Sequence, residues 1–170
     1  MKMLFAVLTM LLIVAGSPAG AAPVPATPQV HPVAAKHVIY VVRHFQKGDG
    51  ADPSLTAEGA ANAQRLAAML KDKGIAAIFA TPTRRAMETA APLAKLLGIH
   101  VRPYDPSGFG QLAALAAAAG GPVLIVGHSN TVPSIVESLG GARPSPLADQ
   151  DYGTLFEVEP GGKVVTIPVS

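Results

Sequence analysis

The sequence predicts a three-layer α/β/α sandwich with a mostly parallel sheet and an antiparallel edge hairpin. Two short apolar runs, at 38–42 and 123–126, are typical of strands that are buried on both faces. Longer segments with apolar residues at helical spacing lie between these runs. Such alternation of strands and helices favours a parallel sheet covered by helices. Near the C-terminus, two further strand-like segments flank Pro160-Gly161-Gly162, which predicts a hairpin turn.

The order of elements follows from caps, breakers and periodicity. Thr56 is expected to cap the first helix, and Gly74 lies just past its predicted end. Pro92 falls inside the second helical pattern, where it can kink the helix. The expected strands are 38–42, 75–80, 99–102, 123–126, 152–158 and 164–169, and the expected helices are 56–73, 83–97, 111–119 and 131–139.

The first 36 of the 170 residues are expected to stay outside this fold. Residues 1–21 resemble a secretory signal peptide, because Lys2 precedes an apolar stretch that is too short to span a bilayer and small residues follow it. An uncleaved membrane anchor is the alternative. Residues 22–36 are rich in Pro and Ala and predict an extended linker, so the domain is placed at 37–170. The expected location is periplasmic or secreted, with no stable membrane insertion after cleavage.

Composition limits the remaining function classes. The 170 residues suffice for one domain with a core, and the 13 basic and 11 acidic residues leave a net charge of only +2. This surplus of positive charge is too small to predict nucleic-acid binding, and the sequence contains no run of Lys or Arg with interleaved aromatic residues. The chain contains no cysteine, which excludes disulfides and lipid attachment at a cysteine.

Cationic side chains follow the ends of three predicted elements. Arg43 and His44 end the first strand, His128 follows the strand 123–126, and Arg85 lies in the first turn of the second helix. Because the carboxyl ends of parallel strands share one sheet edge, these four residues are expected to converge there. Guanidinium and imidazole groups suit phosphate or sulfate oxygens. A metal site is the competing interpretation, but arginines beside the ligands would repel the cation, so no metal is expected.

Four short motifs, taken together, resemble those of a known family. Arg43-His44 follows an apolar strand, Leu55-Thr56-x-x-Gly59 opens a helix, Arg85-Ala86-x-x-Thr89-Ala90 opens the next one, and Gly127-His128-Ser129 follows a second apolar strand. Each motif alone is weak, but all four occur in order between residues 37 and 158. In this respect the chain resembles the histidine phosphatase superfamily, which includes phosphoglycerate mutases and phosphohistidine phosphatases.

This resemblance implies a histidine acid-type phosphatase without a cofactor. His44 would be the nucleophile, and Arg43, Arg85 and His128 would hold the phosphate oxygens. The substrate would be a small phosphorylated molecule or a phosphoprotein, with the bond a phosphomonoester, a phosphohistidine or a phosphoanhydride. Mutase activity is less expected because the predicted loops are short. The alternative from another class is a catalytically silent module that binds phosphate or a phosphoprotein.

Two residues after the nucleophile depart from the family pattern. Relatives usually carry a small residue where this chain has Phe45, and often Glu where it has Gln46. The Phe45 ring could narrow the pocket, stack on a substrate or point into the core. The first two possibilities would change substrate preference or weaken activity.

The proton donor for the leaving group is the least defined role. Asp105 is the first candidate, because it follows a short strand on the same expected sheet edge. Glu88 and Asp52 are the alternatives. A leaving group that is already good, such as a phosphohistidine ring, would require no donor.

Overall fold

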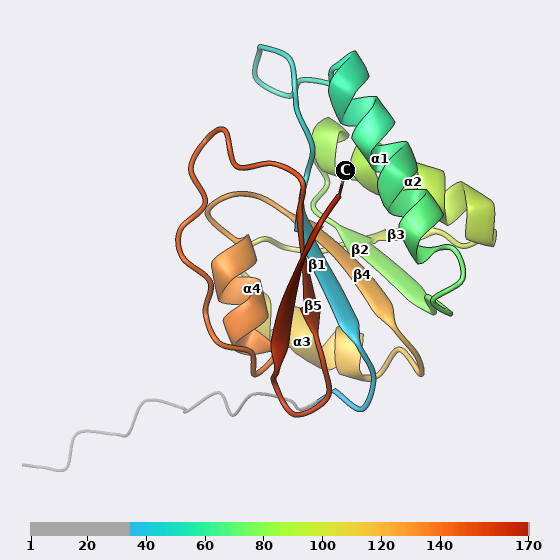
Figure 1. The fold of residues 1–170 in the computed structure, drawn as a ribbon, viewed down its shortest axis with the longest axis vertical. Coiled ribbons are helices and arrows are strands. Elements are labelled where there is room, and N and C mark those ends of the chain that lie inside the picture. Colours follow the sequence, from blue (N-terminus) through green and yellow to red (C-terminus); the bar gives the residue numbers. More distant parts are fainter. Residues whose placement is uncertain (1–34, 170) are drawn as a thin grey trace, which may run out of the picture.

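The computed structural model describes residues 35–169 and confirms the predicted α/β fold (Figure 1). The predicted signal peptide and residues 22–34 of the predicted linker lie outside the described residues. The strands are β1 (Ile39–Arg43), β2 (Ala77–Ala80), β3 (Val101–Pro103), β4 (Val123–Gly127), β5 (Thr154–Val158) and β6 (Val164–Pro168). The helices are α1 (Ala57–Leu70), α2 (Arg84–Leu97), α3 (Phe109–Ala117) and α4 (Val132–Ser138).

The six strands form one sheet in the order β3-β2-β4-β1-β5-β6. The pairs β3–β2, β2–β4 and β4–β1 are parallel, whereas β5 runs antiparallel to β1 and β6 runs antiparallel to β5. The sheet is therefore mostly parallel, and the antiparallel hairpin is at its edge as the sequence predicts. The two central strands β1 and β4 are fully buried because helices cover both of their faces.

Each face of the sheet has its own apolar core. Tyr40 and Val42 of β1 point into a core that α1 and α2 cover, and Ile39 and Val41 point into a second core under α3 and α4. This alternation follows from the two-residue period of a strand. Figure 1 shows α1 and α2 together on one side of the sheet and α3 and α4 on the other.

Element ends differ from the prediction by a few residues. Thr56 caps α1 as predicted, but the helix ends at Leu70, because residues 71–74 form a turn that Gly74 completes with φ 68°. Gly98 ends α2 in the left-handed conformation, and α2 continues through Pro92. Helix α3 begins at Phe109 and not at residue 111, because a turn at 105–108 leads directly into it.

The register of the central strands fixes the position of the candidate site. Arg43 of β1 lies opposite Gly127 of β4, and Ala80 of β2 lies opposite Val126. His44 and His128 therefore leave the sheet at the same level, and Thr81 leaves it one residue earlier. Parallel pairing of β1, β4 and β2 thus brings three polar side chains to one edge before any loop contributes.

Candidate active site

His44 is buried at the carboxyl end of β1, with both ring nitrogens in contact with defined partners. Only 3% of the residue is exposed. Its Nδ1 lies 2.8 Å from the Phe45 carbonyl oxygen, and the Nε–H of Arg85 points at its Nε2 from 3.2 Å. A carbonyl only accepts and a guanidinium only donates. The two contacts therefore select the tautomer in which Nδ1 carries the proton and Nε2 has a free lone pair.

The surroundings of His44 keep its imidazole neutral. Burial lowers its pKa from the usual 6.5 to about 4, and the nearby charges of His128, Arg85 and Arg43 act in the same direction. The Phe45 carbonyl opposes this shift by accepting the Nδ1 proton. At neutral pH the His44 side chain is thus an uncharged base with its lone pair directed at Arg85.

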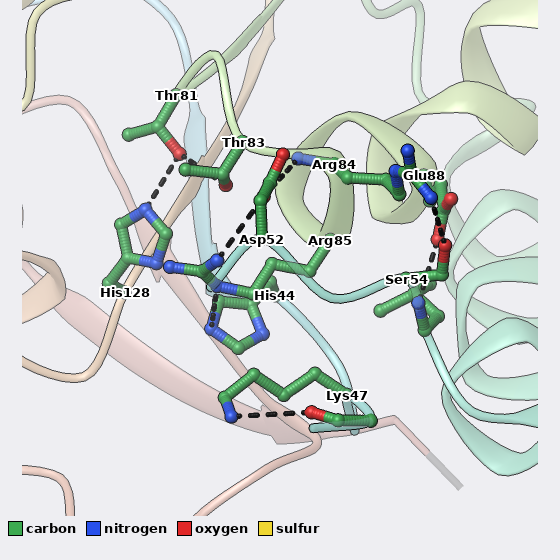
Figure 2. Close-up of polar contacts among 12 residues, drawn as sticks. His44, Lys47, Asp52, Ser54, Thr81, Thr83, Arg84, Arg85, Glu88 and His128 are labelled. Carbon is green, nitrogen blue, oxygen red and sulfur yellow. Dashed lines mark hydrogen bonds and ion pairs between the residues drawn. The ribbon is translucent and has the colours of Figure 1, made fainter. Parts of the chain in front are cut away.

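His128 lies beside His44 and is held by a hydroxyl group. The two rings are 5.1 Å apart between centroids and meet edge to face. The Nε2 of His128 lies 2.7 Å from the Oγ1 of Thr81, while the opposite edge of the ring turns toward Arg85 (Figure 2). Burial, and then Arg85 and Arg43, lower the pKa of His128 to about 4. A second neutral imidazole therefore faces the same space.

Arg85 enters the site from the first turn of α2. Figure 2 shows its guanidinium between the two histidine rings, where its Nε–H meets His44 and one terminal nitrogen lies 3.5 Å from Asp52. The adjacent Arg84 turns away and donates to the Ser54 hydroxyl. The structure thus brings Arg85, and not Arg84, to the histidines.

Arg43 is the last residue of β1 and is held by the loop before β5. Its terminal nitrogen donates to the carbonyl oxygens of Ala148 at 2.7 Å and Asp151 at 3.2 Å, and its guanidinium lies over the Tyr152 ring at 4.1 Å. Arg43 is only 5% exposed, and its Nε has no hydrogen-bond partner among the described residues. A buried cationic donor without a partner is costly unless a ligand supplies an acceptor.

The Phe45 ring points into the core and does not narrow the pocket. It is fully buried against the apolar residues beneath α1 and α2. The backbone of Phe45 instead serves the site, because its carbonyl meets His44 and its N–H donates to the Thr89 hydroxyl at 3.2 Å. Thr89 in turn donates to the Arg85 carbonyl. Thr89 therefore ties the turn that carries the Arg85 side chain to the backbone next to His44.

Gln46 connects the start of α1 to the same backbone. Its carbonyl accepts from the N–H of Thr56, and Thr56 caps α1 through the N–H of Gly59. A Cβ at Gly59 would lie 2.2 Å from the Gln46 carbonyl oxygen, so only glycine permits this approach. The Gln46 side chain is also fixed, between Glu58 and Asn62. The Leu-Thr-x-x-Gly motif therefore seats the loop that follows His44.

The three candidate proton donors lie in different places. Asp105 is exposed and accepts from the N–H and hydroxyl of Ser107, which lowers the pKa of Asp105. No polar contact joins it to the histidines among the described residues. Glu88 accepts from the backbone N–H of Leu55 at 2.7 Å and so fastens the loop to α2. Asp52 is the candidate that contacts Arg85.

Two side chains of the site were missed in the sequence. Thr81 holds His128, and its only signal is its place between β2 and the start of α2. Tyr152 packs on Arg43, and its ring centroid is 6.1 Å from that of His44. Tyr152 belongs to a loop before β5 that carries no motif. Both residues could be assigned only after the pairing of β2 and β5 was known.

The polar groups around the two histidines are mainly cationic or neutral, and the Asp52 carboxylate contacts Arg85 at their margin. In residues 35–169, no three His, Cys, Asp or Glu side chains gather in a group that could hold a metal ion. None of the helices in that range is long and apolar enough to cross a membrane. Arg43, Arg85 and His128 instead lie near His44 and carry groups that can bind an oxyanion.

A comparison with protein families finds one match. Residues 39–105 match the histidine phosphatase superfamily (branch 1). This span includes Arg43, His44, Arg85 and Asp105, whereas His128 lies beyond it. No curated protein sequence matches the chain.

Solved structures share the fold over most of the chain. Protein histidine phosphatase SixA in complex with tungstate is 18% identical, with a TM-score of 0.61, and the match covers 78% of this chain and 97% of that one. A mycobacterial glucosyl-3-phosphoglycerate phosphatase with inorganic phosphate is 16% identical, with a TM-score of 0.57 and 77% and 94% coverage. A Bacillus anthracis phosphoglycerate mutase is also 16% identical, with a TM-score of 0.57 and 77% and 91% coverage. The solved structures therefore show that the fold is shared, and the family model matches its first part, residues 39–105.

Proposed function

We propose that this chain is a member of the histidine phosphatase superfamily and that it hydrolyses a phosphorylated substrate, without a metal, through a phosphohistidine on His44. The family match supports phosphatase activity in general terms. The observation that carries the proposed mechanism is the state of His44, whose ring is neutral at physiological pH and whose unprotonated Nε2 directs its lone pair at the Arg85 Nε–H. A neutral imidazole at such a position is a competent nucleophile.

In the first step, the Nε2 of His44 forms a bond to phosphorus and the bond from phosphorus to the leaving group breaks. The leaving group takes a proton from solvent or an acid, or leaves without one when it is already stable. The ring then carries both the phosphoryl group and the Nδ1 proton. The Phe45 carbonyl, 2.8 Å from Nδ1, stabilises the positive charge that the ring acquires.

In the second step, a water oxygen attacks phosphorus and the bond from Nε2 to phosphorus breaks. The water gives up a proton, inorganic phosphate leaves, and the His44 lone pair is restored. Charge on the phosphoryl oxygens is spread over the reaction, so fixed cations lower the barrier of both steps. Arg85 and the unpartnered Nε of Arg43 supply these cations, and His128 supplies a neutral hydrogen-bonding group.

The low pKa of His44 supports the acid-type character of the proposed phosphatase. With a pKa of about 4, the ring remains unprotonated at pH values where an ordinary imidazole would be charged. A small phosphorylated molecule or a phosphoprotein is the proposed substrate class. The bond cleaved would be a phosphomonoester, a phosphohistidine or a phosphoanhydride.

A catalytically silent phosphate-binding module is the competing function. In the sequence, Phe45 favoured this alternative because its ring could obstruct the nucleophile. The buried ring of Phe45 removes that argument. Asp105, the first candidate proton donor, is exposed. Without a proton donor, poor leaving groups would turn over slowly, and this is the feature that still favours the binding module.

The decisive experiment is hydrolysis of p-nitrophenyl phosphate in EDTA by the wild type and by His44→Ala. Turnover that survives EDTA and disappears in the variant is the expected result. A radiolabelled phosphoenzyme that is stable to alkali and labile to acid would identify phosphohistidine. Phosphate binding without turnover would replace the enzyme with the binding module, and inhibition by EDTA would revive a metal-dependent reaction.

We also propose that the protein is exported to the periplasm or secreted after cleavage following residue 21. The signal-peptide features of residues 1–21 support this location. N-terminal sequencing of the mature protein, combined with fractionation of the cells, tests it. Full-length protein in the membrane fraction would contradict cleavage.

A further inference from the structure

Beside the His44 site, the surface is hollowed between two loops. The hollow has a volume of about 420 Å³. Its walls come from the end of β1 and the loop after it, and from the loop before β5. The side chains that line it include Arg43, Gln46, Lys47, Asp49, Asp149 and Tyr152.

Arg43 connects this hollow to the reaction centre. Its buried Nε requires an acceptor, which a bound phosphoryl group supplies. The same side chain lines the hollow, as does Tyr152, whose ring centroid is 6.1 Å from that of His44. A substrate whose phosphoryl group rests on Arg43 and His44 therefore has space for its remaining part in the hollow.

The charges around the hollow favour one kind of leaving group. The phosphoryl group neutralises Arg43, and the loop carbonyls already occupy one of its nitrogens. The remaining lining charges are Lys47, Asp49 and Asp149, whose sum is −1. Asp151 adds a further carboxylate in the same loop, where it accepts from the N–H of Ala148.

We propose that this hollow is the leaving-group subsite of the phosphatase and that it selects leaving groups with a positive charge over those with a negative charge. The inference rests on the proposed function. It specifies the substrate class as phosphoesters of amino alcohols and similar cationic groups. Phosphoesters of hydroxy acids, which bring a second anion to Asp49 and Asp149, are disfavoured.

The test compares three phosphoesters of similar size and different charge: phosphoethanolamine, 2-hydroxyethyl phosphate and phosphoglycolate. At low salt we expect kcat/KM to fall in that order, with about a threefold to fivefold difference between the first and the last, because Lys47 offsets the contribution of one of the two carboxylates. Each carboxylate contributes about threefold to fivefold to the ratio of the kcat/KM values. The reason is that two unit charges about 4 Å apart in water interact by about 1 kcal/mol, which corresponds to about a fivefold change in binding. At 0.5 M NaCl the preference should shrink, since exposed charges are screened.

Variants assign the preference to the hollow. Asp49→Asn and Asp149→Asn should each reduce the ratio of phosphoethanolamine to phosphoglycolate by about threefold, and Lys47→Gln should raise it by a similar factor. Asp72→Asn is the matched control, because this exposed carboxylate lies beyond the end of α1 and should leave the ratio unchanged. A ratio near one in the wild type, or an equal response to Asp72→Asn, would overturn the inference.

The proposed function can fail separately. If the wild type hydrolyses p-nitrophenyl phosphate but does not discriminate among the three esters, only the subsite is refuted. If no ester is hydrolysed, dissociation constants of the same three esters for the wild type give the preference directly. Tighter binding of phosphoethanolamine would then support the subsite in a binding module, and equal constants would refute it.

Discussion

Replacing Gly59 with alanine tests how the start of α1 supports the nucleophile. Gly59 is the third residue of α1, and the Gln46 carbonyl oxygen occupies the space in which a Cβ would stand. The separation would be 2.2 Å, and the neighbouring Gln46 backbone atoms lie at 3.1 Å. Relief therefore requires movement of the backbone that follows His44, because the obstructing atoms do not belong to a flexible side chain.

The sign of the stability change is diagnostic. In a helix, alanine is favoured over glycine by about 1 kcal/mol. Insertion of a methyl group into a filled space costs about 1–3 kcal/mol and exceeds this gain when the obstruction is backbone. We therefore expect a net loss of stability of up to about 2 kcal/mol. Movement of Gln46 also shifts the Phe45 carbonyl, so kcat should fall by at least about tenfold as the orientation of the His44 ring is lost.

Urea unfolding and p-nitrophenyl phosphate kinetics measure the two effects. Gly48→Ala is the matched control in the same loop, because its Cβ would meet nothing closer than 3.9 Å and Gly48 does not adopt a left-handed φ. This control should be as stable and active as the wild type, or slightly more stable. A Gly59→Ala protein that equals the wild type in both assays would refute the proposed support.

Three further predictions concern the histidines and their partners. In NMR titrations, His44 and His128 should each show a pKa of about 4, and titration near 6.5 would contradict this. The free energy of unfolding should fall as the pH drops from about 6.5 toward 4, because the imidazoles of the unfolded chain take up protons first. Thr81→Val should lower kcat/KM about tenfold and change the His128 tautomer seen in nitrogen-15 shifts. Thr81→Ser, which keeps the hydroxyl, should retain both the wild-type kcat/KM and the wild-type tautomer. An unaltered tautomer in the valine variant would refute the role of the hydroxyl. Tyr152→Ala should weaken phosphate binding about twofold to fivefold while Tyr152→Phe preserves it, and equal loss in both would show that the ring face is not what matters.

The fold could be predicted from the sequence because its central strands are unambiguous. The runs that became β1 and β4 are apolar at every position, and only a sheet covered on both faces buries such segments. Helix ends were less accurate, as with α1, which ends three residues before Lys73. The turn at 71–74 contains two helix-favouring residues, Lys71 and Lys73, before Gly74. Local propensity alone therefore does not distinguish this turn from a last helical turn.

The site could be predicted in part, because strand ends are visible in a sequence and loop partners are not. Arg43, His44 and His128 follow directly from the ends of β1 and β4, and their meeting follows from the parallel register. The same reasoning places Asp105 first among the candidate proton donors. It does follow β3, but β3 is the edge strand, two strands away from β4, and the carboxylate turns to Ser107. Position at a strand end thus predicts proximity only for neighbouring strands.

The motifs that carry no reactive group converge on a short piece of backbone. The Thr89 hydroxyl accepts from the N–H of Phe45, the Phe45 carbonyl holds the His44 ring, and the Gln46 carbonyl meets the N–H of Thr56. What these contacts require of residue 45 is its backbone N–H and C=O, both of which any residue except proline provides. The large side chain at this position is therefore compatible with an intact site, because it leaves the backbone in place and enters the core. The unusual residue at position 45 is accordingly a change in core packing. Phe45→Ala should therefore reduce the free energy of unfolding by about 3–5 kcal/mol. In the molecules that remain folded, the pKa of His44 should stay at about 4.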